Sequence, residues 1–165
     1  MNSDELKAMQ APIKERYREQ PDTAVVTLKA EGRLGDDLSC SVQTGRALVE
    51  AGLHPATGGD GTQVCSGDML LQALAACAGV TMRSVATALG ISAIGTVRAE
   101  GDLDFRGTLG VDKSASVGFS DIRLTSDLQS DASEEQLATL LRLTERYCVV
   151  LQTLANSPRL TASIG

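Results

Sequence analysis

The feature that most constrains the fold is a long apolar segment near the middle of the chain. The fourteen residues from Met69 to Met82 include no charged side chain. They belong to a helical pattern that Ser66 or Asp68 can cap and that Gly90 can end. Because this run is shorter than the roughly 20 residues that cross a bilayer, we predict a buried core helix.

The same helix bears on assembly. Its first half is apolar on nearly all sides, whereas a helix at the surface of a domain shows one apolar face. The chain has 165 residues, the size of one ordinary domain. A domain of this size rarely encloses a helix completely, so we expect a second subunit to help cover it.

The segments before this helix alternate with the period of strands. Asp22 to Leu34 predicts a half-buried strand, and Gly35 to Asp37 predicts a turn. Leu38, Cys40 and Val42 then share one face of a second strand. Gly45 to Gly52 fits either a third strand or a short helix. The glycine-rich stretch from Leu53 to Gly67 predicts a long loop.

The segments after the helix predict more strands and one more helical region. Ile91 to Arg106 and Val117 to Leu128 alternate as strands do, and Arg159 to Ile164 predicts a short final strand. Ser133 and Gln136 form a capping box that opens an apolar helix. We expect a break in it near Tyr147.

This order of elements predicts an α+β fold with an antiparallel sheet rather than a doubly wound one. We expect a single domain over residues 1–165, in which residues 1–21 form an N-terminal helical extension. That helix is weakly amphipathic, and Pro12 predicts an interruption or a new start within it.

Composition excludes several classes of function. The net charge is −6, and only four residues are aromatic, so we expect no nucleic-acid partner and no membrane partner. The charged N-terminus does not resemble a signal peptide. With four cysteines and no CxxC pair, we expect a cytoplasmic protein whose cysteines rest as thiols.

No motif for a nucleotide, metal or other cofactor is present, and we expect none to be required. The single histidine, His54, lies beside Pro55 in the long loop. It could act as a base, but a lone loop histidine is more often solvated.

Among the cysteines, Cys77 is the candidate for chemistry. It lies in the middle of the apolar helix, where a free cysteine commonly packs as a small hydrophobic residue. Its neighbours are alanine and glycine, which leaves room beside the sulfur. Cys148 lies in the second apolar region, and the two could form a disulfide if their Cα atoms come within about 7 Å. Cys65 could be a loop thiol, and Cys40 fits the core.

Two segments carry a resemblance to a known family. The stretch from Ser66 to Cys77, followed by Thr81 and Val85, resembles the central-helix signature of the OsmC/Ohr family. The stretch from Glu145 to Leu154 is similar to that family's second-cysteine segment, and the 71-residue separation of Cys77 from Cys148 fits it.

The resemblance implies antiparallel sheets wrapped around two central helices in an intertwined homodimer. It implies a thiol peroxidase that reduces organic hydroperoxides or hydrogen peroxide. Cys77 would be the peroxidatic thiol and Cys148 the resolving thiol, with an external dithiol as reductant. A non-catalytic dimer of the same fold, which senses redox state or binds a small ligand, is the alternative.

The sequence departs from the family at one position. Peroxidases of the family pair an arginine on an early strand with a glutamate at the start of the central helix. Arg33 is the best match for the arginine, and Arg46 is the second. The glutamate position falls on Gly67, and the nearest acid is Asp68. Asp68 could replace the glutamate or only cap the helix.

Overall fold

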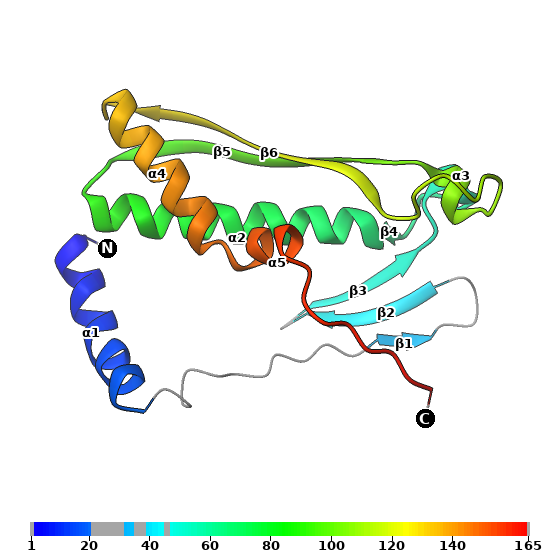
Figure 1. Cartoon of the computed structure of the whole chain (residues 1–165), viewed down its shortest axis with the longest axis horizontal. Helices are drawn as coiled ribbons and strands as arrows, with labels where there is room; N and C mark the ends of the chain where they lie inside the picture. Colours follow the sequence, from blue (N-terminus) through cyan, green and yellow to red (C-terminus); the bar gives the residue numbers. More distant parts are fainter. Residues whose placement is uncertain (1, 21–31, 35–38, 45–46, 165) are drawn as a thin grey trace. The chain divides into compact units, whose positions relative to one another are not determined.

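A computed structural model describes residues 2–20, 32–34, 39–44 and 47–164 (Figure 1). It confirms an α+β protein. In chain order its elements are α1 (Ser3–Glu19), β1 (Gly32–Leu34), β2 (Ser39–Thr44), β3 (Ala47–Gly52), the 3₁₀ turn η2 (Pro55–Thr57), β4 (Val64–Cys65), α2 (Ser66–Leu89), β5 (Ala93–Leu103), α3 (Phe105–Thr108), β6 (Phe119–Ser130), α4 (Glu134–Tyr147) and α5 (Val149–Ala155).

The first sheet has the strand order β1-β2-β3-β4. The β1–β2 and β2–β3 pairs are antiparallel, and they place Arg33 opposite Ser41. The segment that fitted either a strand or a helix is therefore a strand, β3. The short β3–β4 pair is parallel, so the sheet is not antiparallel throughout. The predicted first strand lies within the described residues only at its end, as β1.

The second sheet is a long two-stranded antiparallel ribbon of β5 and β6 (Figure 1). Both strands were predicted from the sequence and are confirmed. The two strands approach closely at Gly95. Its φ is +155°, and an added Cβ would collide with the carbonyl oxygen of Asp127. Glycine is required there because any side chain would meet the backbone of the neighbouring strand.

The capping box at the start of α4 is present as predicted. The Gln136 backbone N–H donates to the Ser133 hydroxyl at 3.3 Å, and the Ser133 backbone N–H donates to the Gln136 side chain at 2.9 Å. The expected break near Tyr147 is also confirmed, because α4 ends there and α5 begins at Val149.

Two predictions about local structure were wrong. Pro12 lies inside a continuous α1 rather than at a break, so the helix forms despite the backbone donor that proline lacks. Residues 159–164 form no strand. Their sequence suits a strand, but a strand needs a neighbour to complete its hydrogen bonds, and no described strand pairs with them.

The chain forms two compact units, and α2, β5 and β6 contribute to both. The first unit comprises Met1–Glu15, Ala73–Arg98 and Thr125–Gly165, and the second comprises Arg16–Gln72 and Ala99–Leu124. The core of the first unit contains four buried side chains from α2, the segment after it, and α4: Met82, Ala86, Ile91 and Leu140.

Within the single chain, α2 is buried along one stripe only. Leu74, Ala78, Met82 and Ala86 recur every fourth residue and are buried. In the most apolar 18-residue window of the helix, 22% is buried. The expectation of a helix buried on most sides is therefore not met by one chain.

The helix α2 is also longer than the uncharged run from Met69 to Met82. It includes Asp68 before that run and Arg83 after it. Among the described helices, only α2 is long and apolar enough to cross a membrane. Core helices of soluble proteins meet the same criterion.

Replacing Gly95 with alanine should destabilise the fold. The new Cβ would force β5 away from the Asp127 carbonyl, and the positive φ adds backbone strain, so we expect a loss of about 2 kcal/mol in the free energy of unfolding. Urea denaturation measures it. Gly118→Ala is the control, since its Cβ would meet nothing within 4 Å. Equal stability of the two variants would contradict the close approach of the strands.

Candidate functional site

The Cys77 thiol belongs to α2, in the first unit. It lies next to the junction between α4 and α5. Cys77 is half-buried in α2, and Cys148 is completely buried in the single extended residue between α4 and α5. The sequence placed Cys148 inside a helix, but its ψ of 107° belongs to a strand-like conformation that reorients the chain. The two thiols that the sequence singled out are hydrogen-bonded to each other.

The break at Cys148 exposes the first turn of α5 to the Cys77 sulfur. The first amides of a helix have no carbonyl acceptor within that helix. The backbone N–H groups of Val149 and Val150 donate to the Cys77 sulfur instead. The Thr81 hydroxyl, one turn after Cys77 on α2, hydrogen-bonds to it as well.

The two thiols differ in acidity. Burial alone would raise the pKa of Cys77, but the hydrogen bonds from Val150, Cys148, Val149 and Thr81 together lower it, because they stabilise a thiolate. Burial raises the pKa of Cys148, and its bond to Cys77 raises it further, because the Cys148 proton is held between the two sulfurs. Cys77 is therefore the more acidic thiol of the pair, and Cys148 is the less acidic one.

Of the other candidate residues, Arg33, Arg46 and Asp68, only Asp68 has a described side chain. Arg33 lies in β1 in the second unit, and the position of its side chain is outside the described residues, as is Arg46. Asp68 lies in the first turn of α2, about two and a half turns before Cys77. Its carboxylate therefore does not touch the Cys77 sulfur.

Asp68 instead belongs to a cavity of about 330 Å³ in the second unit, which sequence reasoning missed. His54, Cys65 and Gly67 line the same cavity. A Cβ on Gly67 would lie 3.4 Å from the Phe119 ring and 3.6 Å from the Cys65 sulfur, which is ordinary contact. The backbone at Gly67 therefore lies close to the side chains of Phe119 and Cys65.

His54 has a structural role at the edge of this cavity. Its Nδ1 accepts the backbone N–H of Ala56 at 3.0 Å and so caps η2. Its ring stacks on Phe105 with centroids 4.9 Å apart. Because Nδ1 is occupied as an acceptor, the neutral ring carries its proton on Nε2.

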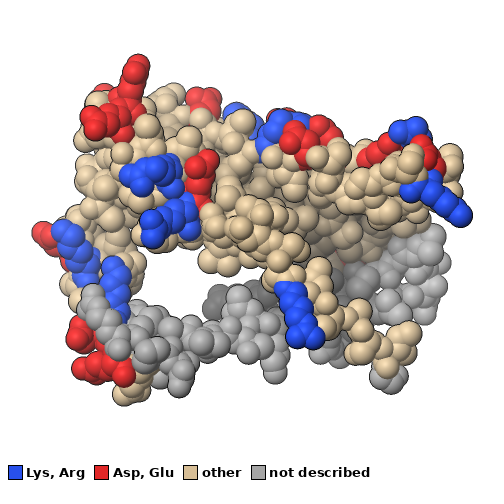
Figure 2. Space-filling model, viewed as in Figure 1, with Lys and Arg blue, Asp and Glu red and all other residues tan. Residues whose placement is uncertain are grey.

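Two arginines of the second unit form ion pairs with aspartates. Arg123 binds Asp102 and Asp121, and Arg106 binds Asp104 and Asp112. Figure 2 shows basic and acidic groups side by side over the β5–β6 ribbon. In the described part of the chain, no three His, Cys, Asp or Glu side chains converge as metal ligands would.

Removing the Cys148 thiol should make Cys77 less acidic. In Cys148→Ala, the Cys77 thiolate loses a hydrogen-bond donor, so the midpoint of its alkylation by iodoacetamide should move to higher pH. Alkylation of Cys77 is followed by peptide mass spectrometry across pH. Cys65→Ala should leave the midpoint unchanged. A midpoint that stays constant or falls in Cys148→Ala would disprove the hydrogen bond.

Comparisons with known proteins agree with this arrangement of elements. Solved structures with the same fold include an OsmC-like protein from Mycoplasma pneumoniae, which is 20% identical with a TM-score of 0.67 and matches over 80% of this chain and 89% of its own. An organic hydroperoxide resistance protein OsmC from Legionella pneumophila is 16% identical, with a TM-score of 0.59. The match covers 80% of this chain and 91% of that protein.

The organic hydroperoxide resistance protein OhrB of Bacillus subtilis is 19% identical, with a TM-score of 0.51 over 80% and 93% of the two chains. No curated protein matches the sequence. The family model described as OsmC-like protein matches residues 59–163, which include both Cys77 and Cys148 and more than half of the chain. The chain belongs to the OsmC/Ohr family of proteins.

Proposed function

We propose that this protein is a cysteine-based peroxidase that reduces organic hydroperoxides or hydrogen peroxide. One observation carries the proposal: a thiol of lowered pKa, Cys77, is hydrogen-bonded to a thiol of raised pKa, Cys148. A peroxidase of this kind needs one nucleophilic thiolate and one nearby thiol. Two proteins of the same fold are described as organic hydroperoxide resistance proteins, which supports the choice of substrate.

The first step forms a sulfenic acid. The Cys77 thiolate attacks the terminal oxygen of the hydroperoxide, the O–O bond breaks, and the alcohol leaves after it takes up a proton. Sulfur is oxidised and the peroxide is reduced by two electrons. The amides of Val149 and Val150 favour the ionised form of Cys77, because they stabilise its negative charge.

The second step forms a disulfide. Cys148 attacks the sulfur of the Cys77 sulfenic acid, the S–S bond forms, and hydroxide leaves and is protonated to water. The raised pKa of Cys148 keeps its proton in place until the sulfenic acid has formed. An external dithiol then reduces the disulfide by thiol–disulfide exchange. The cycle requires reduced cysteines at rest, which fits a cytoplasmic location.

Arg33 and Asp68 enter the proposal as aids to activation. Arg33, on β1, would supply a positive charge to the thiolate, and Asp68 would orient it in place of the glutamate that is absent at Gly67. The support for these roles is the family resemblance of their positions.

The alternative function is a redox-sensing or ligand-binding dimer of the same fold. Gly67 favours it, because the residue that should orient the activating arginine is missing. The lowered pKa of Cys77 favours the peroxidase, because a thiol that only senses or packs needs no such stabilisation of its thiolate. Turnover separates the two: a peroxidase produces many equivalents of alcohol per Cys77 when dithiothreitol is present, and a sensor produces one.

Reduced protein mixed with cumene hydroperoxide should form a Cys77–Cys148 disulfide, detected by peptide mapping. Cys77→Ser should consume no hydroperoxide at this site. Cys148→Ser should stop at the sulfenic acid, which dimedone traps on Cys77. If the wild type loses no more thiols than Cys77→Ser, the protein is not a peroxidase.

The same assay tests the activating arginine. Arg33→Gln should slow thiol oxidation about tenfold or more, and Arg46→Gln should not. Cys65→Ser is a further control and should react as the wild type does. Equal rates for both arginine variants would remove Arg33 from the mechanism.

We propose further that the protein is a homodimer. Within the described structure of one chain, only 22% of the most apolar window of α2 is buried, and a second copy would cover more of it. Sedimentation equilibrium should therefore give twice the chain mass of 17.2 kDa. A mass of one chain across micromolar concentrations would refute the dimer.

A further inference from the structure

The junction between α4 and α5 takes a regular hydrogen bond away from one carbonyl of α4. In an α-helix each N–H donates to the carbonyl four residues earlier, so an unbroken helix would join Val149 to Glu145. The chain changes direction at Cys148 instead (Figure 1), and the Val149 N–H donates to the Cys77 sulfur. The bond just before is regular, because the Cys148 N–H donates to the Thr144 carbonyl at 2.9 Å. The Glu145 carbonyl is therefore the first in α4 that loses the donor of a regular helix.

The side chain of Gln152 supplies a donor in its place. Gln152 lies one turn into α5, and its Nε2 donates to the Glu145 carbonyl oxygen at 2.9 Å, across the break. Its backbone N–H donates to the Cys148 carbonyl, also at 2.9 Å, and so resumes regular helical bonding. One residue thus holds both sides of the break: its main chain belongs to α5, and its side chain binds the last turn of α4.

A neighbouring amide fixes the direction of the Gln152 side chain. The Asn156 Nδ2 donates to the Gln152 Oε1 at 3.2 Å and to the Gln152 carbonyl oxygen at 3.2 Å. Because the amide oxygen is held by this donor, the amide nitrogen faces the Glu145 carbonyl. Both ends of the Gln152 amide therefore have partners, and only a side chain with a donor of this length fits the contact.

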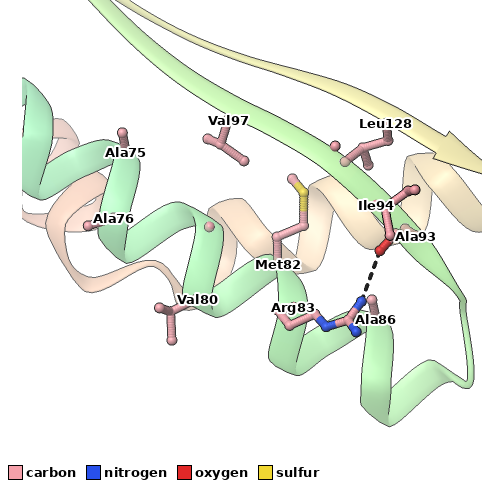
Figure 3. Close-up of a pocket in the computed structure, with 12 residues that line it drawn as sticks. Ala75, Ala76, Val80, Met82, Arg83, Ala86, Ala93, Ile94, Val97 and Leu128 are labelled. Atoms are coloured by element: carbon pink, nitrogen blue, oxygen red, sulfur yellow. Dashed lines mark hydrogen bonds between the residues drawn. The ribbon is translucent and has the colours of Figure 1, made fainter.

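A bond of the same kind joins two other elements of the first unit. One Nη of Arg83 donates to the Ala93 carbonyl oxygen at 2.9 Å and links α2 to the first residue of β5 (Figure 3). Both residues line the cavity drawn in Figure 3. The Gln152 bond differs in its consequence, because the group that it replaces, the Val149 amide, is in contact with the Cys77 sulfur.

From these contacts we propose that Gln152 is a positioning residue of the thiol site: its side-chain amide takes the place of the Val149 N–H at the Glu145 carbonyl and leaves that N–H directed at the Cys77 sulfur. Without Gln152, the carbonyl would compete with the sulfur for the same N–H, because an unmade hydrogen bond costs free energy. Gln152 acts through Val149 and not on the sulfur itself. The purpose of the contact, activation of Cys77, rests on the proposed peroxidase.

Alkylation of Cys77 by iodoacetamide in the full-length protein, followed by peptide mass spectrometry, tests the proposal. Gln152→Met keeps the length and the helix preference of the side chain but has no amide donor. Alkylation at pH 7 should slow roughly threefold or more, and the midpoint of its pH profile should move to higher pH, because fewer molecules would carry the thiolate. A side chain that only stabilised the fold would leave that midpoint unchanged.

Thr153→Val is the matched control. The Thr153 hydroxyl donates to the Val149 carbonyl at 2.8 Å, so this variant also removes a side-chain bond to the main chain of α5, but one that does not cross the break. It should be alkylated as fast as the wild type. Asn156→Ala, which leaves the Gln152 amide without its orienting donor, should slow alkylation by less than Gln152→Met does.

A double variant tests the route through Val149. Val149→Pro removes the N–H, and proline suits the first residue of a helix that follows an extended residue such as Cys148. If Gln152 acts through that N–H, Gln152→Met should slow alkylation in the wild-type background and have no further effect in Val149→Pro.

Three results would overturn the proposal: alkylation of Gln152→Met at the wild-type rate, equal slowing in Gln152→Met and Thr153→Val, or equal slowing by Gln152→Met in both Val149 backgrounds. Iodoacetamide reports on the thiolate without any peroxide. If Gln152→Met slows alkylation as expected and cumene hydroperoxide still fails to oxidise the wild type, the positioning role stands and the peroxidase does not.

Discussion

The Cys77 sulfur accepts hydrogen bonds from the first amides of α5, and the chemistry proposed for this protein depends on that contact. Those amides are available because α5 starts afresh after Cys148 instead of continuing α4. A continuous helix would have used them for its own carbonyls. The same break places the Cys148 thiol against Cys77, so one local change of backbone direction supplies both the stabilised thiolate and its partner.

Small side chains on α2 make the rest of the arrangement possible. Alanine and glycine surround Cys77 in the sequence, and its side chain is only half-buried. At the start of the helix, Gly67 and Asp68 line a cavity of about 330 Å³.

Most elements could be predicted from the sequence, because their signals are local. The alternation of residues with the period of a strand predicted β5 and β6, and the capping box predicted the start of α4. The predicted strand at residues 159–164 is absent, because a strand also needs a partner that its own pattern does not specify. The strand at Ala47–Gly52 was ambiguous for the same reason, and its pairing with β2 decides it.

For the site, the sequence alone determined the two thiols, their family and the glycine at position 67, because residue identity and spacing record them directly. Only the tertiary structure decided which thiol is the more acidic. The acidity of Cys77 and Cys148 depends on burial and on amides more than 70 residues away along the chain from Cys77. The cavity beside Asp68 was likewise invisible in the sequence, since a cavity is a property of the space between elements and not of any one of them.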